Sequence, residues 1–342
     1  MTTQHLSPLT MLLSRHTRRR QFITLLSSAA AAWPLAARAQ QPAMPVVGVL
    51  NMQTPQSETT QLSAIRQGLK ECGFVEGQNM TFDLRFAEGR NDRLPILAAE
   101  LVRRQVKLIV ANTTPPAIAA KAATTTIPIV FAVGADPVEL GLVASFNRPG
   151  GNVTGVAFLV NKLVAKRLEL LCETVPKKSM IGMLVDPNNP NAKSDVQLTQ
   201  AAANTLGRTL VIANVATEND LDEAFASLME HHIGALFVAP NANFRIWRDR
   251  LLALVARHGI PSSYSNGDFV RAGGLMSYGP DQADAYRQAG IYAGRVLKGE
   301  KPADLPVAQP TKFDFVLNLK AANTLGLTLP PTMLALASET IE

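Results

Sequence analysis

Residues 107–116 read KLIVANTTPP, and this stretch decides the fold. A short apolar run, Lys107–Ala111, has the length and composition of a buried strand. Polar residues and two prolines follow it directly, before an Ala-rich segment of helical length. Proline is tolerated in the first turn of a helix, where its missing N–H is not needed. The pattern therefore predicts a parallel strand that turns into a helix, as in a βαβ unit.

The same alternation of short apolar runs and longer amphipathic ones continues through the rest of the chain from Met44. A turn cluster at 148–152, RPGGN, interrupts it and separates two series. In the first, we expect strands over 46–50, 81–87, 107–111 and 127–133, and helices over 57–72 and 92–104, the latter with Asp92 as its N-cap. In the second, we expect strands over 180–185, 210–215, 235–239, 261–265, 274–278 and 312–319, and helices over 161–175, 195–206, 220–232, 244–258 and 281–297.

The length of 342 residues exceeds the roughly 250–300 at which a single hydrophobic core stops growing, so two lobes are expected. The predicted fold class is α/β, with two Rossmann-like lobes that contain parallel sheets and are joined by a three-strand hinge. If the chain crosses near 155, 275 and 309, one lobe comprises 46–155 plus 276–308. The other comprises 156–275 plus 309–342. Two hinged α/β lobes are suited to closing around a small ligand.

The net charge of +6 comes almost entirely from the first 39 residues. Five arginines and no acidic residue lie there, at positions 15, 18, 19, 20 and 38. The remaining 303 residues are nearly neutral. They lack the basic surface that a nucleic acid partner requires, so we expect none.

Residues 1–39 have the features of an export signal. A basic stretch ends at Arg20, an Ala-rich apolar run spans 22–37, and small residues flank a cleavage site between Ala39 and Gln40. Arg19 and Arg20 resemble a twin-arginine signal. The apolar run is shorter than the roughly 20 residues of a spanning helix. We expect a cleaved leader and a periplasmic protein, with a plain secretory signal or an uncleaved anchor as alternatives.

Ligand-binding residues are sought in the loops that follow strands, because open α/β sheets bind ligands at the carboxyl ends of their strands. In the first lobe these candidates are Thr113 and Thr114, at a helix start that could hold a carboxylate or phosphate. Capping of their own helix is the alternative role. Asp136 is similarly suited to capping the helix that Pro137 begins. The other candidates in this lobe are Asn51, Gln53 and Gly134.

The second lobe offers amide groups at Asn188, Asn189 and Asn241, in loops where asparagine is common for conformational reasons as well. Tyr264 and Tyr278 end predicted strands and could flank the apolar part of a solute. Their alternative role is core packing with the hydroxyl in water. Trp247 is interpreted as half-buried packing beside a solvated basic face formed by Arg245, Arg248 and Arg250.

Catalytic and metal-binding motifs are absent from the sequence. His231, His232 and His258 lie at predicted helix ends, where favourable interaction with the helix dipole explains them. No metal-ligand spacing, nucleophile elbow, Walker A loop or dinucleotide fingerprint occurs. We therefore expect no metal and no cofactor. Cys72 and Cys172 fall in different lobes, which favours two free thiols over a disulfide.

Several long motifs together resemble the solute-binding proteins of ABC importers, in the branch associated with aromatic amino acid uptake. The resemblance covers essentially all of 44–342. It rests on IPIVFA at 127–132, DPV at 136–138, GLVA at 141–144, NRPGGNVTG at 147–155, AGGLMSYG at 272–279, and GEKPADLP at 299–306 running into PTKF at 310–313.

The resemblance implies a type I periplasmic binding fold that closes on a solute and delivers it to ABC permease subunits driven by a cytoplasmic ATPase. It also implies that the loops at Thr113–Thr114 and 134–136 face the ligand. We expect a monomer that binds a small solute carrying a carboxylate, such as an amino acid or an aromatic acid, and that is not an enzyme. Two alternatives remain: an exported hydrolase-like enzyme, with Asp136 and Asp186 as the carboxylates to consider, and a LacI-like ligand sensor without a DNA-binding domain.

Overall fold

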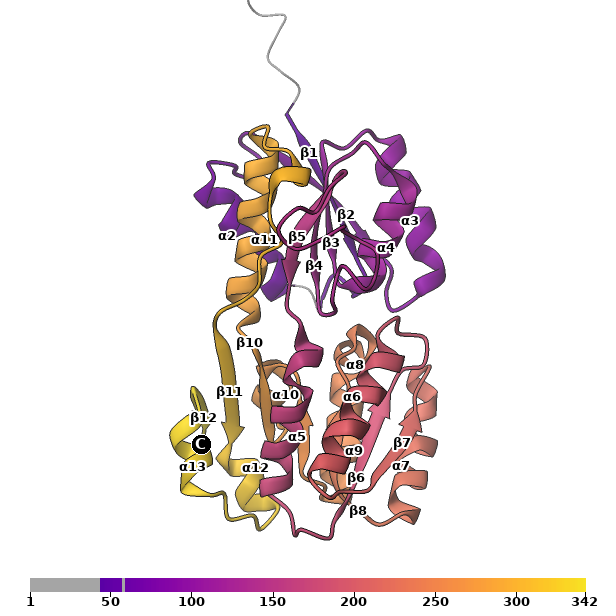
Figure 1. Cartoon of the computed structure of the whole chain (residues 1–342), viewed down its shortest axis with the longest axis vertical. Helices are drawn as coiled ribbons and strands as arrows, with labels where there is room; N and C mark the ends of the chain where they lie inside the picture. The colour runs from indigo at the N-terminus through magenta and orange to yellow at the C-terminus, as the bar shows by residue number, and fades with distance from the viewer. Residues whose placement is uncertain (1–43, 57–58) are drawn as a thin grey trace, which may run out of the picture. The chain divides into compact units, whose positions relative to one another are not determined.

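Two sheets organise the residues described by the computed structural model, which are 44–56 and 59–342 (Figure 1). Pro45–Glu342 form one unit. The expected leader and its cleavage site, within 1–40, lie outside the described residues.

The first sheet has five strands, all parallel, in the order β2-β1-β3-β4-β5. Strands β3, β4 and β5 are buried along their whole length, because helices cover both faces of the sheet. Helices α2 and α11 pack on one face, and α3 and α4 pack on the other. The elements are β1 Val46–Asn51, β2 Thr81–Phe86, β3 Leu108–Asn112, β4 Ile129–Val133, β5 Val153–Ala157, α2 Thr59–Glu71, η1 Asn91–Arg93, α3 Leu94–Arg103, α4 Thr114–Ala123, α11 Gln282–Leu297 and η4 Pro302–Asp304.

The second sheet has seven strands in the order β12-β11-β10-β9-β8-β6-β7. All its pairs are parallel except β10 with β11, which is antiparallel, so the expected lobes with parallel sheets are confirmed with this one antiparallel pair added. Its strands are β6 Met180–Val185, β7 Leu210–Asn214, β8 Ile233–Val238, β9 Ser262–Tyr264, β10 Met276–Pro280, β11 Phe313–Asn318 and β12 Glu339–Ile341. Its helices are η2 Val160–Leu163, α5 Val164–Glu173, α6 Ala192–Thr205, η3 Glu218–Asp220, α7 Leu221–Glu230, α8 Ala242–Ile246, α9 Arg248–His258, α10 Gly267–Arg271, α12 Leu319–Thr324 and α13 Pro331–Leu336.

The chain passes between the sheets three times, and two of the three boundaries differ from the expected positions. It leaves the first sheet after β5 and returns from β10 into α11. It crosses again between Ala308, which bridges to Val156 of β5, and β11. Because β10 pairs with β9 and β11, residues 276–280 belong to the second sheet. We therefore propose lobe boundaries near 158, 281 and 309 in place of 155, 275 and 309.

Several local expectations also differ from the structure. Strand β5 follows the turn cluster and was not expected, and neither were the short elements α10, α12, α13 and β12. The helix expected over 244–258 divides at Trp247 into α8 and α9. Asp92 lies inside η1 and caps no helix; its carboxylate pairs with the exposed Arg90 instead.

Helices α2 and α11 approach closely at two glycines. A Cβ on Gly290 would fall on the carbonyl oxygen of Ile65, and one on Gly68 would fall on the carbonyl oxygen of Arg287. The backbones are therefore in contact where the helices cross, and a side chain at either position would separate them. The crossing also positions three residues of the cavity described next, because α2 carries Gln61 and α11 carries Gln282 and Tyr286.

Candidate functional site

A cavity of about 770 Å³, counting space open to solvent, lies at the carboxyl ends of strands from both sheets. This is where the topology of parallel α/β sheets leads one to expect a ligand. Loops after β1, β3, β4, β5, β6, β8 and β9 contribute, together with α2, α8 and α11. The lining residues are Met52, Gln53, Gln61, Asn91, Thr113, Thr114, Pro115, Ala132, Gly134, Phe158, Val160, Asp186, Asn189, Asn191, Pro240, Asn241, Ala242, Asn243, Arg245, Ser265, Asn266, Gln282 and Tyr286.

The loop after β3 has a strained backbone at Thr113, with φ 78° and ψ 170°. A β-branched residue rarely adopts a positive φ. The Thr113 side chain makes no capping hydrogen bond, so it does not take the alternative role of a helix cap. Its Oγ1 atom is buried and has no hydrogen-bond partner among the described residues. A strained residue that presents an unpaired hydroxyl to a cavity has the properties of a ligand contact.

The first turn of α4 supplies fewer backbone donors than the sequence interpretation assumed. Pro115 and Pro116 carry no N–H, and the Ala117 N–H donates to the Thr113 carbonyl oxygen over 3.3 Å. Thr114 therefore provides the remaining N–H of this turn. Because the prolines lack an N–H, the helix start offers one backbone donor, the Thr114 N–H. The helix dipole adds partial positive charge there.

Opposite these groups, the loop after β6 presents a buried carboxylate whose hydrogen-bond donors, within residues 44–56 and 59–342, are all amides. Asp186 is 2% exposed and accepts hydrogen bonds from Asn188 N (2.8 Å), Asn241 Nδ2 (3.0 Å) and Asn243 Nδ2 (3.2 Å). Among the described residues, no Lys, Arg or His lies within ion-pair distance of it. The carboxylate is well oriented but has no compensating charge.

Two amide oxygens beside Asp186 are also unsatisfied. Asn191 Oδ1 and Asn243 Oδ1 are buried without hydrogen-bond partners in the part of the chain that the structure describes. Asn191 lies in the loop after β6 and Asn243 in α8, and these segments are joined by Asn189, whose Nδ2 donates to the Pro240 carbonyl oxygen over 3.0 Å. This side of the cavity therefore offers hydrogen-bond acceptors and negative charge, which favours a ligand group rich in N–H donors.

The apolar part of the cavity is built around Phe158 and Tyr286. Their rings meet edge to face, with centroids 5.3 Å apart and planes at 76°, and both side chains are at least nine-tenths buried. Val160, Pro115 and Pro240 add apolar surface. Rings fixed in this way form a rigid wall against which a flat apolar group can pack.

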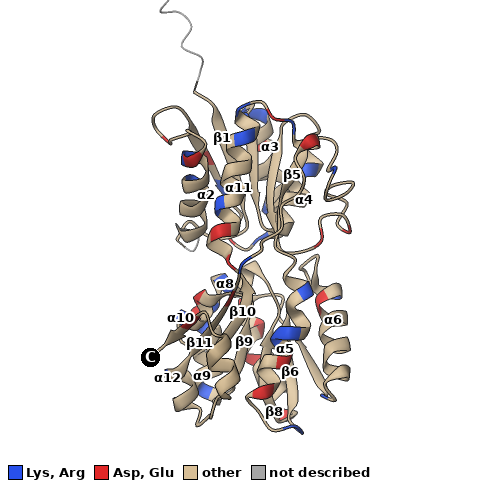
Figure 2. Cartoon of the chain, turned by 60° about the vertical axis from the view of Figure 1, so that its left-hand side comes forward, with Lys and Arg blue, Asp and Glu red and all other residues tan. Residues whose placement is uncertain are grey.

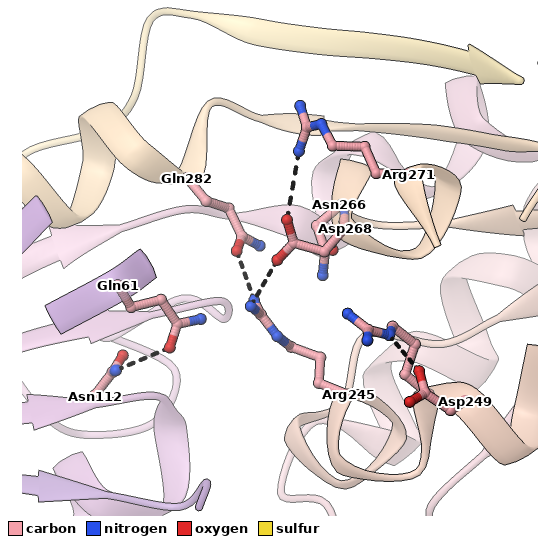
Figure 3. Close-up of polar contacts among 9 residues, drawn as sticks. Gln61, Asn112, Arg245, Asp249, Asn266, Asp268, Arg271 and Gln282 are labelled. Atoms are coloured by element: carbon pink, nitrogen blue, oxygen red, sulfur yellow. Dashed lines mark hydrogen bonds and ion pairs between the residues drawn. The ribbon is translucent and has the colours of Figure 1, made fainter. Parts of the chain in front are cut away.

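Arg245 forms a polar wall on another side (Figure 3). Its Nη1 donates to Gln282 Oε1 over 2.8 Å, and its Nη2 donates to Asp268 Oδ2 over 2.8 Å. In the same view, Gln61 Oε1 accepts from Asn112 Nδ2 over 3.2 Å. The expectation that Arg245 belongs to a solvated face is wrong, since its side chain is only 13% exposed. Trp247 is half-buried as expected and packs on Phe244 with centroids 6.0 Å apart.

The structure brings six of the predicted site residues to the cavity and leaves five outside it. The six are Gln53, Thr113, Thr114, Gly134, Asn189 and Asn241. Of the other five, Asn51 is fully buried and its Oδ1 accepts from Gln53 N, which orients the loop. Asp136 Oδ1 accepts from Val138 N (2.8 Å), but residues 137–141 form a turn, so the helix that Asp136 was expected to cap is not present. The side chain of Asn188 is exposed, and only its backbone contacts Asp186.

The two tyrosines are the clearest departures. Tyr264 stacks flat on Phe269, with centroids 4.5 Å apart, and its ring is 1% exposed. Burial raises its pKa, and its hydroxyl does not reach water. Tyr278 packs on Phe315 at 6.1 Å. Both serve the core of the second lobe, because strand residues that face the helices are buried there, and neither lines the cavity.

Sequence reasoning missed the residues that helices contribute. Helices α2, α8 and α11 contribute four of them: Gln61, Arg245, Gln282 and Tyr286. The search was limited to loops that follow strands, so it did not include these helices. Asp186 and Asn243 lay in loops that the rule did identify. Their importance comes from mutual contacts across more than fifty residues of sequence, which no local pattern reveals.

Other expectations concern groups outside the cavity. Cys72 and Cys172 are both free thiols, as expected. His231 Nδ1 contacts the Ser227 carbonyl oxygen at the end of α7, and His258 stacks on Phe225.

Among the described residues, no group of three or more His, Cys, Asp or Glu could hold a metal ion. Within the same residues, no helix combines the length and apolar composition that crossing a membrane requires. Figure 2 shows charges of both signs interspersed over the helices.

Comparisons with known proteins agree with this architecture. Residues 46–341 match the family described as ABC transporter substrate binding protein. A tyrosine-binding protein from Clostridioides difficile is 30% identical over 253 residues, which are 74% of this chain and 72% of that protein. A conserved domain protein from Vibrio cholerae has a similar structure, with a TM-score of 0.81, 30% identity and coverage of 87% of this chain and 99% of that one. An ABC domain from Streptococcus pneumoniae in complex with L-Trp gives a TM-score of 0.80, 28% identity and coverage of 87% and 100%.

The family match spans nearly the whole described chain, and the two solved structures named above share its fold at 28–30% sequence identity. This is a family of binding proteins, so the alternative of an exported enzyme is set aside. The chain belongs to the ABC transporter substrate binding protein family.

Proposed function

We propose that the protein binds an L-amino acid with an aromatic side chain in this cavity, closes its two lobes around it, and delivers it to an ABC permease. The proposal rests on one observation: hydrogen-bond acceptors line one side of the cavity and hydrogen-bond donors line the other. An uncompensated carboxylate and unsatisfied amide oxygens lie on the second-sheet side, and hydroxyl and N–H donors lie on the first-sheet side. A zwitterion complements both.

The ammonium group of the solute would lie beside Asp186. Burying a carboxylate without a countercharge is costly, and a bound ammonium supplies that charge together with three N–H donors. Asn191 Oδ1 and Asn243 Oδ1, which have no hydrogen-bond partner among the described residues, would accept two of these. A solute that lacks the ammonium would leave the two amide oxygens unpaired and the charge of Asp186 uncompensated.

The carboxylate of the solute would lie at Thr113 and Thr114. The Thr114 N–H and the Thr113 hydroxyl are the donors, and the N-terminal end of the ten-residue helix α4 favours negative charge. The single available N–H at this turn suits one carboxylate oxygen, with the hydroxyl pairing the other.

The side chain of the solute would pack against Phe158 and Tyr286. Relatives described as tyrosine-binding, or crystallised with L-Trp, support an aromatic amino acid over other zwitterions. Edge-to-face and stacked contacts with fixed rings add about 0.5–1.5 kcal/mol beyond simple burial of apolar area.

The partners follow from the family. The closed protein would dock on the transmembrane subunits of an ABC permease, which a cytoplasmic ATPase drives. It would act in the periplasm as a monomer, with the expected leader of residues 1–39 removed after export.

Calorimetric titration with matched analogues tests the assignment. L-tyrosine, L-tryptophan and L-phenylalanine are compared with tyramine and tryptamine, which lack the carboxylate, and with 3-(4-hydroxyphenyl)propionate, which lacks the ammonium. We expect each analogue to bind at least about a hundredfold more weakly than its parent, because each leaves buried polar groups unpaired. Equal affinity for a parent and its analogue would remove the corresponding half of the assignment, and no binding of any of the three amino acids would reject the solute class.

A further inference from the structure

We propose that Arg245 limits the length of the solute side chain by separating the solute cavity from a second chamber. The inference rests on the proposed function, because it concerns the aromatic amino acid held in that cavity. It adds a specificity-determining residue whose side chain neither the ammonium nor the carboxylate of the solute would contact.

A second chamber of about 610 Å³ adjoins the solute cavity. The two share a wall made of six residues: Gln61, Arg245, Ser265, Asn266, Gln282 and Tyr286. Beyond the second chamber lies an outer recess of about 1360 Å³. Arg245 lines all three spaces, and it is alone in doing so among the residues that the structure describes.

The guanidinium is held from two directions, which makes it a fixed wall. Asp268 of α10 forms a 2.8 Å ion pair with it, and Gln282 at the start of α11 accepts a 2.8 Å hydrogen bond. Asp268 is itself oriented, since Asn266 Oδ1 accepts from its backbone N–H and Arg271 Nη1 donates to its Oδ1. Figure 3 shows Arg245 between Gln282 and Asp268. A planar group anchored at both edges resists displacement by an apolar ligand atom.

The solute side chain would point toward this wall. The five residues assigned to the zwitterion line the solute cavity and do not line the second chamber: Thr113, Thr114, Asp186, Asn191 and Asn243. Tyr286 belongs to both the apolar surface and the shared wall. A side chain that packs on Tyr286 therefore has its far end at the wall that contains Arg245.

The second chamber is lined by more acidic than basic side chains. Asp268, Asp281 and Asp314 line it, together with Arg271 and Arg245 itself. Removing the Arg245 side chain would join the chamber to the solute cavity and leave three carboxylates with one arginine. An extended solute with a cationic end would then fit better than a neutral one of the same size.

The test compares the wild-type protein with Arg245→Ala and Arg248→Ala. Arg248 is a matched control because it follows closely in sequence, pairs with Asp249 and lines only the outer recess. Calorimetry gives the affinity of each protein for L-tyrosine, O-propyl-L-tyrosine and O-(2-aminoethyl)-L-tyrosine. We expect the wild type and Arg248→Ala to favour L-tyrosine over both extended probes by at least about tenfold.

In Arg245→Ala, the ratio of extended-probe affinity to tyrosine affinity should rise at least about tenfold, and more for the aminoethyl probe than for the propyl probe. An unchanged ratio, or an equal rise in Arg248→Ala, overturns the proposal. If Arg245→Ala is unstable, Arg245→Ser in an otherwise identical comparison serves the same purpose. If the wild type binds neither L-tyrosine nor either extended probe, the proposed function fails. A crystal structure of Arg245→Ala then tests the inference separately: we expect the solute cavity and the second chamber to merge, and two spaces that remain divided would overturn it.

Discussion

Asn241 Nδ2 donates a hydrogen bond to Asp186 Oδ2 over 3.0 Å, and this bond joins the loops that follow β6 and β8. The two residues are 55 positions apart in the sequence. The carboxylate is thereby positioned by neutral amides, and no ion pair with it occurs among the described residues, which is the reason for our proposal that the solute ammonium lies there.

Replacing Asp186 with Asn should weaken binding of the aromatic amino acid by about 2–3 kcal/mol, because an ammonium loses its charged partner. Calorimetry measures the change. Asn188→Ala is the matched control, since its side chain is exposed and outside the cavity, and it should leave affinity unchanged. An Asp186→Asn variant that folds normally and binds with wild-type affinity would contradict the placement of the ammonium.

Thr113→Gly should stabilise the solute-free protein by about 1 kcal/mol and weaken solute binding. Glycine adopts the observed φ of 78° without strain, but it removes the hydroxyl. Thr113→Val separates the two effects, since it keeps the strain of a β-branched residue and loses only the hydroxyl. Denaturant unfolding and calorimetry on both variants provide the measurements. Reduced stability of Thr113→Gly would show that the side chain contributes more than its backbone strain costs.

Gly290→Ala should destabilise the protein by several kcal/mol, at least about 3, because the new Cβ meets the backbone of α2 at Ile65. It should also weaken solute binding, because displacement of α11 moves Gln282 and Tyr286. Gly207→Ala is the control: its φ of 63° is strained for alanine, but nothing lies within 4 Å of the added carbon, so a loss of only about 1 kcal/mol is expected. Thermal unfolding distinguishes the two.

The stability of the protein should fall as the pH rises from about 4 to about 7, through Asp195. Burial raises the pKa of this carboxyl to about 7, against the opposing influence of the buried Arg167. Between these pH values the folded protein holds a proton that the unfolded chain has released, so raising the pH favours unfolding.

Asp195→Asn removes this titration. Its free energy of unfolding, measured by denaturant titration at several pH values, should vary less over the same window. The raised pKa would be contradicted by a wild-type free energy of unfolding that does not change between these pH values, or that rises with pH at the same slope as in the variant. The control Asp222→Asn changes an exposed carboxylate and should leave the wild-type pH dependence intact.

Much of the fold could be predicted because its elements depend on local patterns. The strand at Leu108–Asn112 and the helix start at Thr114 follow from an apolar run and from prolines, whose effects act within a few residues. The family resemblance likewise rests on contiguous motifs, and the hydrogen bond that Val138 N donates to Asp136 Oδ1 spans only two residues. The antiparallel pairing of β10 with β11 could not be predicted in this way, since it joins segments separated by more than thirty residues.

The amino-acid sequence by itself determined the two α/β series, the loops at strand ends and the class of protein. Only the tertiary structure decided which of those loops share a cavity, that Tyr264 is core and not site, and that Arg245 and Gln282 meet. The physical reason is the range of the interactions involved. Periodicity, capping and backbone restriction act over one or two turns of chain, whereas a binding site depends on side chains that only folding brings within a few ångströms of one another.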